Sequence, residues 1–296
     1  MTQLGQEQGK QKIAYQGVEG AYSHLACKKV FTGHEAYACE DFQSAILMVE
    51  EEKAEYAMIP LENSTAGRVE EIYRLLPKTH LQIVAEHFEP VNHCLMALPG
   101  VKLEEVKTVS SHPQALAQCF YHLETLNITP IAAVDTALSA KDLASTTSQE
   151  NTSKNHGAIA STLAAELYGL NVLEENFQDI SGNTTRFIVL AKNANEQTYD
   201  PEQAYITSLL FSVRNIPAAL YKALGGFATN GINMIKLESY MDGGTMEASH
   251  FHIDISGYPE QKNMINALEE LNFFAKEIRI LGTYPAHNYR CSHGFV

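Results

Sequence analysis

The chain has 296 residues, of which 45% are hydrophobic and 19% charged, and its formal net charge is -14 at pH 7. This acidic balance argues against nucleic acid or an anionic membrane as a partner, because both are bound by basic surfaces. No apolar run is long enough for a membrane-spanning helix, and residues 1–12 lack the apolar segment of a secretory signal.

Strand-like and helix-like patterns alternate along the first third of the chain, which predicts a mostly parallel sheet with helices. Gly17 and Gly20 mark a tight turn after the first strand, and Asp41 is a candidate N-cap before apolar residues at helical spacing. We expect strands at residues 12–16, 56–60, 81–88 and 93–98, and helices at residues 21–31, 42–49 and 67–76.

The alternation continues to residue 190, where an apolar strand returns to the first group of strands. Two parallel α/β lobes joined by crossing strands place a ligand cleft at the carboxyl ends of the strands. We expect strands at residues 106–109, 131–134, 158–160 and 186–190, helices at 111–123, 136–144 and 162–168, and a polar surface loop at 145–156.

After a polar linker at residues 191–202 the pattern changes to βαββαβ, the order of a ferredoxin-like domain. Pro217 fits the first turn of its first helix, and Gly231 follows the end of that helix. The open edges of such a sheet favour pairing with a second copy, so we predict a homodimer or homotetramer. We expect strands at residues 206–214, 232–240, 246–256 and 277–283, a turn at 242–244 and a second helix at 260–273.

The cysteines and histidines show no metal-ligand spacing. Cys27, Cys94 and Cys119 lie among apolar neighbours, as buried thiols do, so we expect a reducing, cytoplasmic compartment. His250 and His252 alternate along a strand and share one face, but a metal site needs more ligands than this pair. We therefore predict no metal.

A run of four polar side chains follows the strand that ends at Pro60. Glu62, Asn63, Ser64 and Thr65 supply a carboxylate, an amide and two hydroxyls. A helix N-cap explains only one of them, so the run favours a ligand site in addition to a cap.

A second polar motif begins at Ser111. Ser111 and Gln114 fit a capping box and Pro113 fits a first helical turn, so a purely structural role for Ser111 is an equal alternative. Gln118 falls near the same helix face as Ser111. Because a helix N-terminus attracts anions, the two side chains are candidates for an anion site.

The third motif, residues 183–187, precedes an apolar strand and contains one of only six arginines. Arg186 has two interpretations: a structural ion pair, or a partner for a substrate carboxylate. Phe187 is expected in the core.

The fourth motif, residues 17–23, is a glycine turn before a helix. It does not match G-x-G-x-x-G or a Walker motif, so alone it indicates a tight turn and a candidate anion site. No Ser-His-Asp or Cys-His arrangement is visible in the sequence. Together the candidate groups suit anion binding and assistance to a leaving group without covalent catalysis.

In this order the motifs resemble the prephenate dehydratase family over residues 12–283. The resemblance is carried by Pro60-Leu61-Glu62-Asn63-Ser64, by Ser111-His112-Pro113-Gln114 with Gln118, and by Thr185-Arg186-Phe187. The βαββαβ region resembles an ACT domain, an amino-acid-binding module, through Gly231-Ile232-Asn233-Met234-Ile235-Lys236-Leu237-Glu238-Ser239.

The resemblance implies a periplasmic-binding-protein-like catalytic region of two lobes with parallel sheets at residues 12–192, followed by an ACT domain at 203–285. Lobe 1 would comprise residues 12–92 and 186–192, and lobe 2 residues 93–185. The implied reaction converts prephenate to phenylpyruvate, water and CO₂ without a cofactor, on the route to phenylalanine.

The family's functional residues carry over to matching positions. The implied catalytic residues are Thr185, Glu62, Asn63 and Ser64, and the implied substrate-binding residues are Ser111, Gln118, Arg186, Ser23 and Thr65. L-phenylalanine is the implied effector, at Asn215, Ile216, Pro217, Ala218, Ala219, Leu220, Glu238 and Ser239.

The chain departs from the family pattern in the opening turn, which has Val18-Glu19 where many members have Pro after the first Gly. Two further departures lie in the effector region: Ile216-Pro217-Ala218-Ala219-Leu220 stands where many members have Gly-Ala-Leu, and Tyr240-Met241 where many have Arg-Pro. Feedback inhibition is therefore implied less directly than catalysis. The alternatives are an arogenate dehydratase, a non-catalytic amino-acid sensor on the same fold and, more distantly, a transport-type solute-binding protein.

Overall fold

The computed structural model describes residues 11–145, 155–193, 199–214, 216–241 and 250–294. By their internal contacts they divide into two compact units. Unit 1 comprises residues 1–45, 58–68 and 89–186, and unit 2 comprises residues 46–57, 69–88 and 187–296. These boundaries differ from the predicted lobes, so the domain limits at 12–192 and 203–285 stay predictions.

One mixed sheet has the strand order β2-β1-β3-β11-β5, with β4 paired to β3. β1 and β2 are parallel, whereas β3 and β4 form an antiparallel hairpin. Ser44 N–H donates to Asp41 Oδ1 at 2.7 Å, which confirms the predicted cap of α2. The elements of this part are β1 (Lys12–Gln16), α1 (Tyr22–Val30), β2 (Glu35–Cys39), α2 (Phe42–Glu50), β3 (Tyr56–Asn63), β4 (Gly67–Arg68), α3 (Ile72–Leu75), β5 (Gln82–Pro90) and β11 (Thr184–Ala191).

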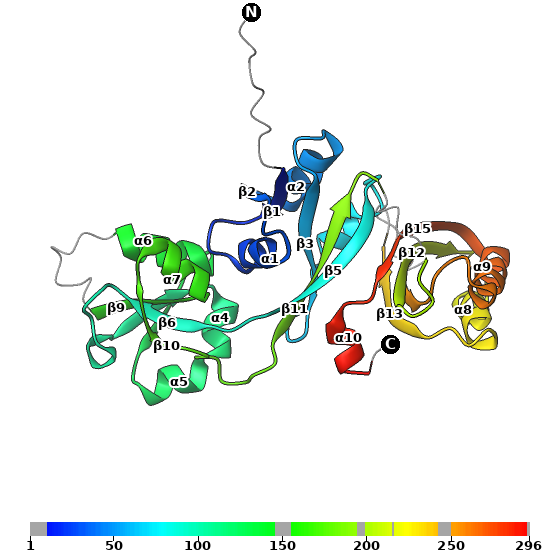
Figure 1. The fold of residues 1–296 in the computed structure, drawn as a ribbon. Coiled ribbons are helices and arrows are strands. Elements are labelled where there is room, and N and C mark those ends of the chain that lie inside the picture. Colours follow the sequence, from blue (N-terminus) through cyan, green and yellow to red (C-terminus); the bar gives the residue numbers. More distant parts are fainter. Residues whose placement is uncertain (1–10, 146–154, 194–198, 215, 242–249, 295–296) are drawn as a thin grey trace, which may run out of the picture. The chain divides into compact units, whose positions relative to one another are not determined.

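A second, five-stranded sheet lies within unit 1, in the order β10-β6-β9-β7-β8. Alternate residues of its central strands enter two separate cores, because neighbouring side chains of a strand point to opposite faces. Met96 packs with α6 and α7, whereas Leu95 packs with α4 and α5 (Figure 1). The elements are β6 (Cys94–Ala97), β7 (Thr108–Ser111), α4 (Pro113–Gln118), α5 (Phe120–Thr125), β8 (Thr129–Ala132), α6 (Thr136–Ser145), β9 (His156–Ala160), α7 (Thr162–Tyr168) and β10 (Asn171–Glu174).

The third sheet, in unit 2, confirms the predicted ferredoxin-like arrangement. Its strand order is β13-β14-β12-β15, and α8 and α9 close a core that contains Phe211, Phe227, Phe251 and Leu271. The elements are β12 (Tyr205–Val213), α8 (Ala219–Thr229), β13 (Met234–Tyr240), β14 (His250–Ser256), α9 (Lys262–Phe274) and β15 (Ala275–Pro285).

The segment after β15 packs against β5 within unit 2. It forms α10 (Asn288–Ser292), and Arg290 makes a two-pronged ion pair with Glu86, at 2.7 Å for Nε–Oε1 and 2.9 Å for Nη2–Oε2. Tyr289 stacks on Phe88 with ring centroids 4.5 Å apart. The end of the chain is therefore attached to β5 by a buried charge pair and an aromatic stack.

Three sequence expectations are wrong in informative ways. The helix expected at residues 67–76 is the hairpin strand β4 followed by the short α3, because the left-handed Gly67 (φ 79°) turns the chain back on β3. The helix expected at 111–123 breaks at Cys119, whose backbone is not helical. Pro217 lies outside α8, since the left-handed Ala218 (φ 61°) cannot belong to the helix.

Strand direction is also only partly as expected. β7 is parallel to β8 and β9, but β6 runs antiparallel to both β9 and β10. Most of the loop expected at 145–156, the turn at 242–244 and the start of the strand expected at 246–256 lie outside the described residues.

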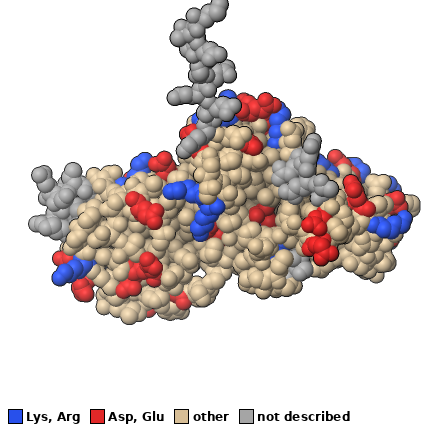
Figure 2. All heavy atoms as spheres, in the orientation of Figure 1, with Lys and Arg blue, Asp and Glu red and all other residues tan. Residues whose placement is uncertain are grey.

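No described helix has the length and apolar character needed to cross a membrane. On the face drawn in Figure 2, acidic and basic side chains are interspersed in small groups, and no continuous basic surface is present there.

Candidate active site

The turn between β3 and β4 is anchored by the side chain of Asn63. Asn63 Oδ1 accepts hydrogen bonds from the backbone N–H groups of Thr65 and Ala66, at 3.0 and 2.9 Å. The polar run is thus a hairpin turn, and the predicted helix cap is wrong. Because both acceptor bonds hold Oδ1, the amide nitrogen of Asn63 must point away from the turn.

That nitrogen connects the first motif with the third. Asn63 Nδ2 donates to Asn183 Oδ1 at 2.7 Å and to Thr185 Oγ1 at 2.9 Å. Ser64 supports the same junction, since Thr184 N–H donates to Ser64 Oγ at 3.0 Å. Two segments more than a hundred residues apart in sequence are therefore joined side chain to side chain.

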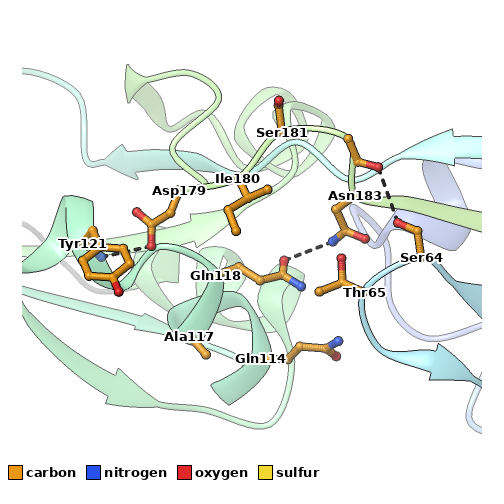
Figure 3. A pocket seen from close by; sticks show the side chains of 11 residues that line it. Ser64, Thr65, Gln114, Ala117, Gln118, Tyr121, Asp179, Ile180, Ser181 and Asn183 are labelled. Carbon is orange, nitrogen blue, oxygen red and sulfur yellow. Dashed lines mark hydrogen bonds between the residues drawn. The ribbon is translucent and has the colours of Figure 1, made fainter.

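Asn183 extends the connection to the second motif. Its Nδ2 donates to Gln118 Oε1 at 3.1 Å (Figure 3), and the same oxygen lies 2.9 Å from His93 Nε2. His93 Nδ1 lies 2.9 Å from the Tyr22 hydroxyl. Burial lowers the pKa of His93 below its usual value, against a smaller opposing effect of the Gln118 contact, so the imidazole is neutral at neutral pH.

A cavity of about 580 Å³ opens beside these side chains, within unit 1. Its volume falls in the range of small-ligand sites, about 300–1,000 Å³. Within the described part of the chain, no Lys or Arg lines this cavity, and Asp179 is the one charged side chain in its wall. The lining residues are Ser64, Thr65, Gln114, Ala117, Gln118, Tyr121, Asp179, Ile180, Ser181, Gly182 and Asn183 (Figure 3).

Asp179, which lines the cavity, also has a structural role. Its carboxylate accepts from the N–H groups of Tyr121 and His122, at 3.0 and 3.1 Å, and so caps α5 where the long predicted helix is broken. Ile180 is 80% exposed and points into the open space from the same loop. The wall therefore combines neutral polar groups and the carboxylate of Asp179 with the exposed apolar side chains of Ala117 and Ile180.

Thr185 is partly exposed, does not itself line the cavity, and reaches its wall through Asn63 and Asn183. Its hydroxyl oxygen accepts from Asn63, so the hydroxyl hydrogen remains to be donated. That hydrogen makes no hydrogen bond to a residue that the structure describes.

Glu62 and Arg186 pair with each other. Arg186 Nη1 donates to Glu62 Oε1 at 2.9 Å, and Arg186 is only 2% exposed. Neither residue lines the cavity. Of the two interpretations of Arg186, the structure shows the ion pair, and contact with a substrate carboxylate stays a prediction.

Ser111 and Ser23 also lie away from the cavity. Ser111 is fully buried and its Oγ donates to the carbonyl of Ile159 on β9 at 2.6 Å, whereas Ser23 stands in the first turn of α1. The capping box assigned to Ser111 is wrong, since His112 is the N-cap of α4 and accepts from Gln114 N–H at 3.2 Å. Pro113 does occupy the first turn.

Replacing Ser111 with alanine tests its structural role. We expect the free energy of unfolding to fall by about 1–3 kcal/mol, because the Ile159 carbonyl loses a buried donor, with no change in ligand affinity. Thermal unfolding and KM measured on one preparation check this. A raised KM with unchanged stability would assign Ser111 to the ligand instead.

The expected effector residues surround the start of α8 and lie on the edge strand β13. Ile216, Pro217 and Ala218 are exposed and Ala219 is buried. Lys236 Nζ donates to Glu238 Oε1 at 3.1 Å on β13. Asn215 lies outside the described residues.

A serine, a histidine and an aspartate do meet on the ferredoxin-like sheet, although the sequence did not reveal it. Ser208 Oγ and Asp254 Oδ1 both approach His252 Nε2, at 2.7 and 3.3 Å, and all three residues are fully buried. A nucleophilic triad needs the carboxylate on the other ring nitrogen and an accessible serine. Among the described residues, no group of three or more ligating side chains is placed to hold a metal.

Four site residues were not predicted from sequence: His93, Tyr22, Asn183 and Asp179. Asn183 stood inside the third motif and Tyr22 inside the fourth, each without an assigned role. His93 lies next to a strand, where nothing in the local pattern distinguishes it.

A family model and two relatives match the part of the chain that contains these motifs. The family model "Prephenate dehydratase" matches residues 13–195. A "Bifunctional N-acyl-homoserine lactone acylase/prephenate dehydratase" of Komagataeibacter europaeus is 43% identical over 282 residues, which is 95% of this chain and 98% of that protein. "Arogenate dehydratase/prephenate dehydratase 1, chloroplastic" of Arabidopsis thaliana is 40% identical, over 94% of this chain and 73% of that protein.

A solved structure shares the fold. Prephenate dehydratase from Arthrobacter aurescens, in complex with L-Phe, is 27% identical and superimposes with a TM-score of 0.81, covering 96% of this chain and 97% of that chain.

Proposed function

The chain belongs to the prephenate dehydratase family and is a carbon–oxygen lyase, and from this premise we propose that it converts prephenate to phenylpyruvate. The observation that carries the proposal is the set of hydrogen bonds joining Asn63, Thr185, Asn183 and Gln118 beside one cavity. These hydrogen bonds connect residues from the three motifs by which the sequence resembles the family.

The reaction is a decarboxylative elimination. The ring carboxylate leaves as CO₂, its bonding electrons enter the ring, and the C4–O bond breaks. The departing hydroxide takes one proton and becomes water, and aromatisation of the ring drives the step. The enzyme must orient the substrate and stabilise the leaving oxygen.

Thr185 is the proposed donor to that oxygen. Asn63 Nδ2 donates to Thr185 Oγ1, which leaves the threonine hydrogen to stabilise the negative charge that develops on the leaving hydroxyl. Threonine acts here by hydrogen bonding and not as an ionised base, because its hydroxyl is far too weak an acid. Glu62 and Arg186 shape this region through their ion pair.

Substrate carboxylate is held by neutral donors in this proposal. Gln118, Ser64 and Thr65 line the cavity, and amide and hydroxyl groups donate well to an anion. In this proposal Arg186 acts indirectly, by holding Glu62 in place through their ion pair.

The direct test is to incubate the purified chain with prephenate, without added metal or nucleotide, and to follow phenylpyruvate by its absorbance in alkali. Arogenate, which has an amino group in place of the side-chain keto group, is supplied in parallel and phenylalanine is assayed. Faster turnover of arogenate would assign the chain to arogenate dehydratases. The absence of both products would favour the non-catalytic amino-acid sensor.

Phenylalanine is proposed as an effector of paired ACT domains at β13 and α8, in a cytoplasmic homo-oligomer. The Arthrobacter relative was solved with L-Phe, and β13 is an edge strand of its sheet. The four buried free thiols among the described cysteines suit a reducing compartment.

Phenylalanine is expected to raise the thermal midpoint of the protein and to lower its dehydratase rate, because a ligand that binds the folded state stabilises it. A thermal-shift titration and a rate titration check this, with D-phenylalanine as the control. No response of either quantity to L-phenylalanine would contradict the effector role.

Acyl transfer is weighed because the Komagataeibacter relative carries an acylase name. In the buried cluster of Ser208, His252 and Asp254 the serine is inaccessible, and the carboxylate approaches the same ring nitrogen as the serine and not the other one. It lends no support to an acylase reaction, and we propose the dehydratase reaction alone.

A further inference from the structure

In the hydrogen-bond network of the site, the donor and the acceptor of each bond can be assigned one after another, beginning from two backbone N–H groups. The N–H groups of Thr65 and Ala66 can only donate, so they hold Asn63 Oδ1 as the acceptor. Asn63 Nδ2 is then a donor, and Asn183 must turn its Oδ1 toward it. Asn183 Nδ2 consequently faces Gln118.

The same reasoning settles the orientation of Gln118. Its Oε1 receives the hydrogen bond of Asn183 Nδ2, and 2.9 Å away on the same oxygen stands His93 Nε2. Two donors on one oxygen require that His93 carries its hydrogen on Nε2. His93 Nδ1 is then an acceptor for the Tyr22 hydroxyl, whose single hydrogen is shared between this nitrogen at 2.9 Å and the Asn92 carbonyl at 2.8 Å.

The remaining polar group of the Gln118 side chain is its amide nitrogen, Nε2. Gln118 Nε2 makes no hydrogen bond to any residue that the structure describes, and Figure 3 shows it turned toward the space between Thr65 and Gln114. Both of its hydrogens are available to a ligand in a cavity that no described Lys or Arg lines. A flipped amide would present an acceptor and repel a carboxylate.

We propose that His93 is a positioning residue that, together with Asn183, locks the Gln118 carboxamide with its NH₂ group toward the cavity, where it donates to a carboxylate of the substrate. This rests on the proposed dehydratase function. His93 itself is 3% exposed and contacts no cavity surface, so it acts only through Gln118.

Steady-state kinetics on full-length variants test the role in binding. Gln118→Glu keeps the shape but puts an anionic acceptor in the cavity, so KM for prephenate should rise by about a hundredfold or more at neutral pH. Affinity should partly return as the pH falls and the new carboxyl becomes a donor.

His93→Phe removes the donor to Oε1 and should raise KM by about tenfold with a smaller change in kcat. His93→Gln, whose amide can reach Gln118 Oε1, should restore most of the affinity. His156→Phe is the control, because His156 is a partly buried histidine of unit 1, bonded to Thr108 and Ser110 and not to the site. If His93→Phe lowers the thermal midpoint as His156→Phe does but leaves KM unchanged, the proposal is overturned.

A readout without substrate separates this proposal from the dehydratase assignment. In the ¹⁵N-labelled wild-type protein, the His93 ring should be the Nε2–H tautomer by NMR, and Gln118→Ala should perturb that nitrogen. An Nδ1–H tautomer would reverse the network and overturn the proposal whether or not prephenate is turned over. A wild-type chain with the Nε2–H tautomer but no dehydratase activity would instead refute the proposed function and, with it, the carboxylate as the ligand of Gln118.

Discussion

Replacing Thr185 with valine is expected to lower kcat for prephenate by about a hundredfold to a thousandfold while KM changes little, as loss of one preorganised donor does in other enzymes. Valine matches the shape of threonine but has no hydroxyl. Asn63 would still hold the turn through Thr65 and Ala66. The substitution should therefore weaken stabilisation of the transition state, in which negative charge develops on the leaving oxygen.

Stopped assays of phenylpyruvate formation over a range of prephenate concentrations separate kcat from KM. Thr185→Ser is the matched control, because it keeps the hydroxyl and should retain most of the wild-type kcat. A Thr185→Val enzyme with wild-type kcat, or one that loses only affinity, would assign Thr185 to binding.

Glu86→Gln is expected to lower the free energy of unfolding by about 3–5 kcal/mol, since removal of one partner leaves a buried charge unpaired. Arg290 is 5% exposed and holds both oxygens of Glu86. A neutral amide cannot match both guanidinium nitrogens. Urea unfolding followed by circular dichroism measures the loss.

The double variant Glu86→Leu with Arg290→Met provides the control. Removing both charges should cost less than removing one, because no buried ion is left without a partner. Equal losses in the single and double variants would show that the segment after β15 is held by the stack of Tyr289 on Phe88 and not by the ion pair.

Local sequence patterns predict those elements whose ends are set by nearby residues. The predicted limits of α7 agree with the structure because Gly169 adopts the left-handed conformation that ends it. The βαββαβ order likewise follows from alternating apolar residues and turns. The break of the helix at Cys119 was not predictable in this way, because the cap of α5 comes from Asp179, some sixty residues further along the chain.

The candidate site was likewise predictable in part from local sequence and depends in part on distant residues. The motif residues Asn63, Gln118 and Thr185 do converge, as the sequence predicted. The partners that orient them could not be foreseen, because a histidine before a strand carries no local signal of a distant glutamine. Arg186 had two interpretations from sequence, an ion pair or a partner for a carboxylate, and the structure shows it buried and paired with Glu62.

Dissolved ions weaken attraction between separated full charges far more than they weaken short contacts between dipoles and an anion. Among the residues that the structure describes, the cavity wall offers a ligand amides and hydroxyls, such as those of Gln118, Ser64 and Thr65, and no cationic side chain. An attraction that salt would screen is therefore missing from this wall, and the monoanionic product of the proposed reaction would depart without the separation of an ion pair.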